Sequence, residues 1–313
     1  MDTRVLVIED DLEINELLGE YLKLEKIGYL QALTGQAGIH LATAEHPDVI
    51  ILDLMLPDID GMEVARTLST RRDTCEIPII IHSCMSHPDA REKAFKCGAH
   101  TFKNKPCPPD DLLAAVASAL EWKAAQPSRL PAGHVVVGGK PDKACALRPL
   151  NQMQVDLLTR GEFSEAEARG VWEAVELLGS WVQNWNQEHP EAPSELTLQY
   201  RISGPSTIPS HAAPADEVQE HAIVEWKLSE NTPGLLWETF FKKENGTSTQ
   251  GSGLIGWGAN ILRPKPAAPA KTTPNPWSQI LTMTGASAFE PDPITKTVRF
   301  ARVTRSVLNA VPA

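Results

Sequence analysis

Two apolar segments of the chain each end in acidic residues, and this pattern constrains the fold more than any other feature of the sequence. Val5–Ile8 is followed directly by Glu9 and Asp10, and Val49–Leu52 is followed directly by Asp53. Short, continuously apolar runs are typical of strands buried on both faces of a parallel sheet. If the two strands are neighbours, three carboxylates meet at their carboxyl ends, which is where open α/β sheets bind ligands.

Three clustered carboxylates repel one another, so we expect a divalent cation among them. Hard oxygen ligands favour Mg²⁺ over zinc. Two more polar side chains follow later strands, Ser83 after Ile79–His82 and Lys105 after the short strand at 101–103. A carboxylate can accept a phosphoryl group when Mg²⁺ and a fixed cation neutralise the phosphoryl oxygens. The sequence therefore predicts a phosphoryl-acceptor site centred on Asp53.

Strand and helix patterns alternate through the first 125 residues. We expect five strands (5–8, 29–33, 49–52, 77–81 and 101–103) and five helices (12–27, 36–45, 61–69, 89–97 and 109–122). Five such units predict an α/β fold, a flavodoxin-like five-stranded parallel sheet, doubly wound with helices on both faces.

Residues 1–123 resemble the receiver domain of two-component response regulators. The resemblance is carried, in order and at the family's spacing, by Glu9-Asp10, Asp53-Leu54-Met55-Leu56-Pro57, Asp60-Gly61, Ser83, Gly98-Ala99, Phe102 and Lys105-Pro106. It implies that Asp53 takes a phosphoryl group from a sensor histidine kinase or a phosphotransfer protein. It also implies that the domain catalyses its own phosphoryl transfer and dephosphorylation.

The same resemblance assigns roles to the surrounding residues. Mg²⁺ would be held by Glu9, Asp10 and Asp53 together with the backbone carbonyl of Met55. Lys105 would pair with the phosphate, and its peptide bond to Pro106 would be cis. By the same resemblance Ser83 moves towards the phosphate and Phe102 turns inwards, which makes a two-state packing switch.

The chain departs from the family pattern around the switch. His82 and Cys84 flank Ser83, where the family usually has an aliphatic residue and Ala, and Cys107 follows where Phe is common. We expect these differences to alter the switch surface and to leave the phosphorylation chemistry intact. A receiver that is never phosphorylated would be expected to lack the Asp or the Lys, and both are present. We expect His87 and His100 to be exposed to solvent.

The composition changes after a predicted linker at 124–132. Seven of the eight Trp residues lie beyond it. A helix at 164–187 and strands at 196–202, 222–228, 280–283 and 298–303 predict a separate α+β output domain over 133–313. The Trp stripe within 171–185 has helical spacing without interleaved basic residues, which favours a core or an interface over a platform for stacked bases.

The order of motifs in 133–313 resembles the ATP-binding (GHKL) domain of histidine kinases. Asn184 falls at the position of the Mg²⁺-ligating Asn, Glu230 and Gly234 in the first glycine box, and Gly251 and Gly253 in the second. Glu230 stands where that family has Asp, and no phospho-accepting His box precedes the domain. Three interpretations stay open: an unrelated α+β domain, a degenerate ATPase-like fold without nucleotide, and a domain that binds ATP.

Charge and cysteine usage limit the partners and the compartment. The formal charge is −11, with 12 Lys+Arg against 21 Asp+Glu in residues 1–127, so DNA is not the expected partner. The five cysteines form no CxxC pair, which is typical of reduced thiols in a cytoplasm. No signal peptide and no membrane span is visible. We therefore expect a soluble, cytoplasmic protein.

These patterns together predict a phosphorelay response regulator with an atypical output domain. The output domain would act by nucleotide binding or by contact with a downstream protein partner. The alternative is a DNA-binding transcriptional response regulator, for which 147–172 offers two short helices around Arg160-Gly161-Glu162. Glu165 and Glu167 against one Arg169 are the opposite of the charge balance that phosphate contacts need. A homodimer is also considered.

Overall fold

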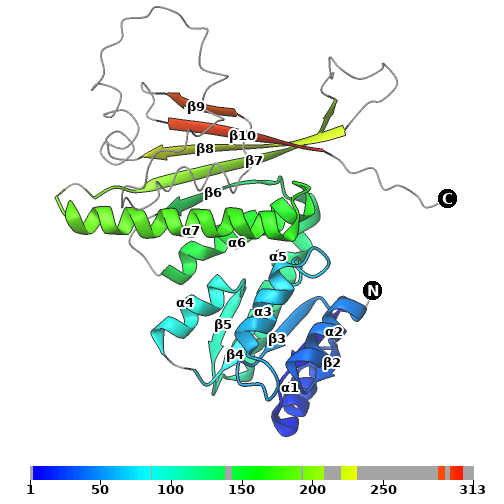
Figure 1. Ribbon diagram of the computed structural model, residues 1–313. Coiled ribbons are helices and arrows are strands. Elements are labelled where there is room, and N and C mark those ends of the chain that lie inside the picture. The colour runs from blue at the N-terminus through cyan, green and yellow to red at the C-terminus, as the bar shows by residue number, and fades with distance from the viewer. Residues whose placement is uncertain are drawn as a thin grey trace, which may run out of the picture.

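The computed structural model describes residues 3–85, 87–137, 143–191, 193–207, 220–230, 288–292 and 297–305. These residues form a parallel sheet with helices on both faces and a separate antiparallel sheet with two long helices (Figure 1). The two predicted fold classes, doubly wound α/β and α+β, are both confirmed.

The parallel sheet contains five strands in the order β2-β1-β3-β4-β5. Its strands are β1 (Arg4–Ile8), β2 (Gly28–Ala32), β3 (Val49–Leu52), β4 (Ile79–Ser83) and β5 (Thr101–Asn104). The chain moves to one side of β1 to form β2 and then crosses to the other side to form β3. This reversal opens a crevice at the carboxyl ends of β1 and β3, where doubly wound sheets bind ligands. The strand ends that carry the acidic residues are therefore neighbours.

Five helices cover the two faces of this sheet: α1 (Leu12–Leu24), α2 (Gly35–Glu45), α3 (Gly61–Thr70), α4 (Pro88–Lys96) and α5 (Pro109–Ala125). Asp11 caps α1 by accepting hydrogen bonds from the backbone N–H groups of Glu13 and Ile14, as expected at a helix start. Helix α1 ends at Leu24, three residues before the predicted end, because Lys26 adopts a left-handed backbone conformation with φ of 60°.

Six of the nine residues in the predicted linker, 124–132, lie in regular elements. They are the last two residues of α5, the 3₁₀ helix η1 (Gln126–Ser128) and the first residue of β6 (Ala132–Val137), and residues 129–131 connect η1 to β6. Arg160 donates hydrogen bonds to the carbonyl oxygens of Gln126 and Arg129. The Gln126 side chain is buried, so this connection is packed against the rest of the protein.

The antiparallel sheet has the order β6-β7-β8-β10-β9. Its other strands are β7 (Leu196–Thr207), β8 (Glu220–Glu230), β9 (Ala288–Asp292) and β10 (Thr297–Arg305). Alternate residues of β7 (Leu196, Leu198 and Tyr200) are buried, the period of two expected for a sheet covered on one face. The strand predicted at 280–283 lies outside the described residues, and β9 was not predicted.

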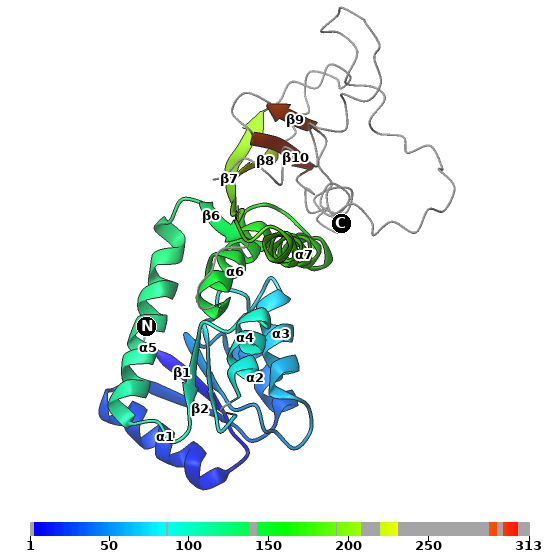
Figure 2. The same cartoon turned by 90° about the vertical axis from the view of Figure 1, so that its left-hand side faces the viewer.

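Two helices cover the buried face of the antiparallel sheet, α6 (Lys143–Thr159) and α7 (Glu165–Glu188). Helix α7 begins with a capping box between Ser164 and Glu167, close to the predicted start at 164. Both helices lie between the antiparallel sheet and the parallel-sheet layer, as the two perpendicular views show (Figures 1 and 2). Within the described residues, no helix combines the length and the apolar character that crossing a membrane requires.

Candidate functional site

Three carboxylates converge at the carboxyl ends of β1 and β3. One oxygen from each of Glu9, Asp10 and Asp53 lies within 4.8 Å of the other two. Glu9 and Asp53 are buried, with 2% and 6% of their surface exposed, whereas Asp10 is exposed. A cluster of hard oxygen donors with one open side fits a divalent cation such as Mg²⁺.

Lys105 neutralises two of these carboxylates. Its Nζ donates to Glu9 Oε2 at 2.6 Å and to Asp53 Oδ2 at 2.7 Å, and its side chain is only 10% exposed. Burial alone would lower the pKa of Lys105, but its hydrogen bonds to Asp53 and Glu9 and their negative charges outweigh that effect and raise it. The pKa of Glu9 is raised because burial outweighs the stabilising contact with Lys105. The positively charged Lys105 side chain is thus held against the Asp53 carboxylate.

The backbone after Asp53 is held close to the carboxylate. The N–H of Leu54 donates to Asp53 Oδ1 at 2.6 Å, and the Asp53 N–H donates to the Ile8 carbonyl at 2.9 Å. Gly61, at the start of α3, allows this loop to pass, because a Cβ at that position would lie 2.4 Å from the Asp53 carbonyl oxygen. Met55, the predicted carbonyl ligand, follows in the same loop with an exposed side chain.

Two buried polar side chains at the end of β4 have no hydrogen-bond partner among the described residues. Ser83 Oγ is one, and the second is His82, with both ring nitrogens unpartnered. Burial, followed by the positive charge of Lys105, lowers the pKa of His82 to about 4, so its ring is neutral at pH 7. Buried polar groups without partners are uncommon and mark places where a ligand or a rearrangement completes the bonding. The sequence singled out His82 as a departure from the family, but gave no sign of this burial.

Phe102 on β5 lies between two hydrophobic cores. It is half-buried and packs against the core formed by one face of the parallel sheet. It also packs against the core that fills the space under the antiparallel sheet. The bond between Lys105 and Pro106, just after β5, is cis as predicted. Every receiver-type site residue from the sequence therefore lies at this crevice or directly behind it.

Residues 5–117 match the family model described as the response regulator receiver domain. This part of the chain is a receiver domain. The remainder, from β6 onwards, is not identified by any of the comparisons below, so we call it the C-terminal domain.

Curated relatives such as the two that follow match this chain over little more than a third of its length. The DNA-binding dual master transcriptional regulator RpaA of Synechocystis sp. is 35% identical over 119 residues, which cover 37% of this chain and 48% of the relative. The cell cycle response regulator CtrA of Brucella ovis is 37% identical over 113 residues, which cover 36% of this chain and 48% of the relative. The chain thus spans about half the length of the curated relatives it matches.

Solved receiver structures also match this part of the chain. The signal receiver domain of a putative Luxo repressor protein from Vibrio parahaemolyticus is 29% identical and aligns with a TM-score of 0.39. The alignment covers 41% of this chain and 97% of that structure.

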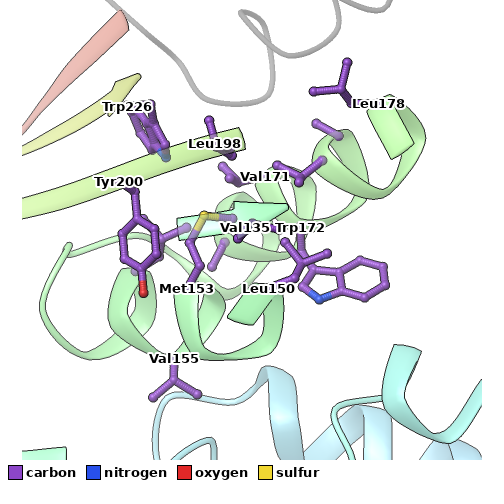
Figure 3. Close-up of a cluster of buried hydrophobic side chains, with 14 of the residues drawn as sticks. Val135, Leu150, Met153, Val155, Val171, Trp172, Leu178, Leu198, Tyr200 and Trp226 are labelled. Carbon is purple, nitrogen blue, oxygen red and sulfur yellow. The ribbon is translucent and has the colours of Figure 1, made fainter. Parts of the chain in front are cut away.

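The receiver domain is packed against the C-terminal domain through a shared core. Receiver residues Cys75 and Phe95 belong to the same buried cluster as Val155, Phe163 and Trp172 of the C-terminal domain. Figure 3 shows that Val155 points away from the strands and towards the receiver, whereas Tyr200 and Trp226 come from the antiparallel sheet. We call the contact of α3 and α4 with α6 and α7 the interdomain interface.

Polar contacts across the interdomain interface use side chains and backbone carbonyls of both domains. Asn151 Nδ2 donates to the Phe95 carbonyl at 2.9 Å, and Gln154 Nε2 donates to the Ser69 carbonyl at 3.1 Å. Lys96 Nζ and Glu176 Oε1 form an ion pair between the domains at 2.8 Å. In the opposite direction, Arg72 donates to the Phe163 carbonyl at 2.7 Å.

The prediction that His100 is exposed was wrong. His100 is half-buried and its ring centroid lies 5.5 Å from that of Trp122. Burial, followed by the nearby charge of Arg148, lowers the pKa of His100 to about 4. The cause is the C-terminal domain itself, because α6 covers the end of the receiver that carries His100. His87, by contrast, is exposed as expected.

The predicted nucleotide-binding residues do not form an assembled site within the described residues. Asn184 has an exposed side chain on α7. Glu230 is the last residue of β8. Gly234, Gly251 and Gly253 lie outside the described residues. ATP binding by the C-terminal domain therefore stays a sequence-based prediction.

Proposed function

We propose that this protein is a phosphorylation-controlled response regulator whose receiver accepts a phosphoryl group on Asp53 from a histidine kinase or a phosphotransfer protein. The observation that carries the proposal is the Lys105 ammonium, bonded to both Asp53 and Glu9 at the mouth of the carboxylate cluster. A phosphoryl group entering there meets a fixed cation already in place, which stabilises the charge on its oxygens without reorganisation.

Mg²⁺ is the proposed cofactor, held by Glu9, Asp10, Asp53 and the carbonyl of Met55. The donor set fits, because the carboxylate oxygens lie within 4.8 Å of one another and include no sulfur or nitrogen ligand. When bound, the cation neutralises the phosphoryl oxygens during transfer. Lys105 then exchanges its bond with the Asp53 carboxylate for a bond with the phosphate. Ser83 Oγ, which has no partner among the described residues, is free to donate to the same phosphate.

We further propose that the C-terminal domain reads this change through the interdomain interface and passes it to a downstream protein partner. Phe102 supports this route, because the side chain two strands from Asp53 touches both the receiver core and the core of the C-terminal domain. A rotation of Phe102 towards the receiver would remove packing from the C-terminal side. Close-packed cores transmit such volume changes.

The test is phosphorylation by a small phosphodonor. Incubated with acetyl phosphate and Mg²⁺, the wild-type chain should show a retarded band on a phosphate-affinity gel, and Asp53→Asn should abolish it. Asp60→Asn is the matched control, since Asp60 caps α3 and Asn is an equally good cap. Retardation of Asp53→Asn to the wild-type extent would refute the assignment.

A DNA-binding transcriptional regulator is the second candidate, and it is favoured by relatives such as RpaA, which is a DNA-binding transcriptional regulator. The helix pair considered for that role is α6 and α7, whose facing sides are buried in the shared core. Glu165 and Glu173 are exposed on α7, while Arg169 bonds to Glu173 and to the Lys96 carbonyl. Retention of the chain on immobilised DNA, lost steeply as salt rises, would favour this candidate over a protein partner.

A further inference from the structure

A cavity of about 300 Å³ lies at the interdomain interface, with walls from both domains. The receiver contributes Cys75, Ile77 and Trp122, and α6 and α7 contribute Gln154, Val155 and Arg169. Small-molecule sites range from about 300 to 1,000 Å³ and occur preferentially at domain interfaces. This volume is at the small end of the range, which suits a ligand with a single ring. We call it the interface cavity.

Arg148 lines the interface cavity and is itself exposed, so it brings a positive charge to the cavity from its solvent side. Its Nη2 donates a 3.3 Å hydrogen bond to Thr101 Oγ1, and its guanidinium lies 5.4 Å from the centre of the Phe95 ring. Within the part of the chain that the structure describes, no carboxylate forms an ion pair with it. The two other cations in the walls are satisfied, Lys96 by Glu176 and Arg169 by Glu173. Because a guanidinium has five N–H donors, Arg148 retains donors for an anion.

Gln154 supplies a second polar group, of opposite kind. It is 5% exposed, and its Nε2 donates to the Ser69 carbonyl. Its Oε1 is buried and has no partner among the described residues. Leaving a buried acceptor unpaired costs free energy that a ligand donor would recover. The cavity therefore presents an unpaired acceptor as well as an unpaired cation.

The remaining walls are apolar or aromatic. Ile77, Pro78 and Val155 are buried, and the rings of His100 and Trp122 lie against each other. His100 is neutral at pH 7, because its pKa is lowered to about 4 by burial and by Arg148. It therefore adds no positive charge that would compete with Arg148 for an anion. Flat apolar walls favour a planar ring.

We propose that the interface cavity binds a small aromatic carboxylate that also carries a hydrogen-bond donor on the opposite side of its ring. The carboxylate pairs with Arg148, the donor is received by Gln154 Oε1, and the ring lies against Trp122. Arg148 and Gln154 are six residues apart on α6, about 9 Å along an ideal helix axis, which matches a benzene ring substituted at both ends. Because both domains form the walls, occupancy stabilises their docked arrangement.

The test uses 4-hydroxybenzoate as probe with the full chain, followed by saturation-transfer NMR and titration. Benzoate, which lacks the donor, and 4-hydroxybenzyl alcohol, which lacks the anion, should each bind several-fold more weakly. Arg148→Gln should weaken the binding of 4-hydroxybenzoate several-fold, since an ion pair at an exposed arginine contributes up to about 1 kcal/mol. Arg66→Gln, at an exposed arginine of α3 that is not among the cavity walls, is the matched control and should bind as wild type does.

Gln154→Leu separates the second contact from any effect on folding. This variant should lose the preference for 4-hydroxybenzoate over benzoate, a ratio measured within one protein and independent of its stability. No saturation transfer to any probe at millimolar concentration would mean a cavity filled by water alone and would overturn the proposal. Equal weakening by Arg148→Gln and Arg66→Gln would overturn it too, and so would an undiminished preference in Gln154→Leu.

Discussion

The phosphoryl-acceptor site and the interdomain interface are held together by different kinds of contact. At the first, side-chain charges meet side-chain charges: Lys105 contacts Glu9 and Asp53 directly, all three nearly buried. At the second, side chains of α6 meet backbone carbonyls of Phe95 and Ser69 around an apolar core. The site therefore changes greatly with one charge, whereas the interface depends on many contacts that are individually small.

The difference teaches where a signal can start and where it can be received. Adding or removing charge in a buried cluster changes its energy by several kcal/mol. The interdomain interface, where apolar packing and hydrogen bonds accompany a partly exposed ion pair, responds instead to shape. We propose that Phe102, which packs against the core on both sides, converts one kind of change into the other.

The largest expected effect comes from Lys105→Ala. Removing the ammonium leaves the buried carboxylates of Glu9 and Asp53 without their counter-charge, which should lower the free energy of unfolding by about 3–5 kcal/mol in the presence of a chelator. Millimolar Mg²⁺ should restore part of this loss, because a cation that binds only the folded state stabilises it. Urea unfolding with and without Mg²⁺ measures both effects. As a control, Lys23→Ala removes an exposed ion pair with Glu20 and should change the free energy of unfolding by less than about 1 kcal/mol.

Asn151→Ala tests a side chain that makes two hydrogen bonds at the interdomain interface. Asn151 donates to the Phe95 carbonyl and accepts from Trp172 Nε1, both at 2.9 Å. Its loss leaves two partly buried groups unpaired and should cost about 2–3 kcal/mol of unfolding free energy. Asn184→Ala, exposed on the same pair of helices, should stay within about 0.5 kcal/mol of wild type. Similar values for the two variants would remove Asn151 from the account of the interface.

His100 should make the interface sensitive to acid. Its folded pKa of about 4 lies below the ordinary value of about 6.5, so the unfolded chain takes up a proton first. Stability is therefore intact above pH 6.5 and is lost as the pH falls towards 4. Between pH 7 and pH 5 the wild type should lose about 1–2 kcal/mol more than His100→Phe. Thermal or urea unfolding at the two pH values gives the comparison, and identical losses would contradict it.

The smallest effect is expected for the ion pair between Lys96 and Glu176. Both side chains are about one-third exposed, and Lys96 also contacts Glu92 at 3.2 Å. A double-mutant cycle with Lys96→Met and Glu176→Gln should give a coupling energy of at most about 1 kcal/mol. A coupling of several kcal/mol would show that charge stabilises the interface as it does the Asp53 site.

The position of the carboxylate cluster could be predicted from the sequence for a local reason. Glu9, Asp10 and Asp53 come at the ends of apolar runs, so the carboxyl ends of neighbouring parallel strands place them together, and no long-range contact has to be guessed. Lys105 follows β5, whose carboxyl end lies at the same edge of the sheet. The Trp stripe of α7 was predicted to form a core or an interface, because helical periodicity is a local signal too. Trp172 is 3% exposed in the core, and Trp181 and Trp185 are partly buried against it.

The interdomain interface gave no comparable signal. Two of its acceptors are the backbone carbonyls of Ser69 and Phe95, and because every residue has a carbonyl, no residue type marks these positions. His100 was expected at the surface because no neighbouring residue in the sequence indicates that α6 covers it. Residues 124–132 read as a linker because of their Pro and Ala content, although the Gln126 side chain is buried.

The way the chain leaves the receiver has a mechanical consequence. Only residues 129–131 separate η1 from β6, and Arg160 fastens the carbonyls of Gln126 and Arg129. The connection between the two domains is therefore too short to let them separate. Separation would first require the end of α5 to unwind or β6 to lose its pairing with the sheet. We therefore expect the signal to change the angle between the two domains while they stay in contact, rather than to separate them on a flexible linker.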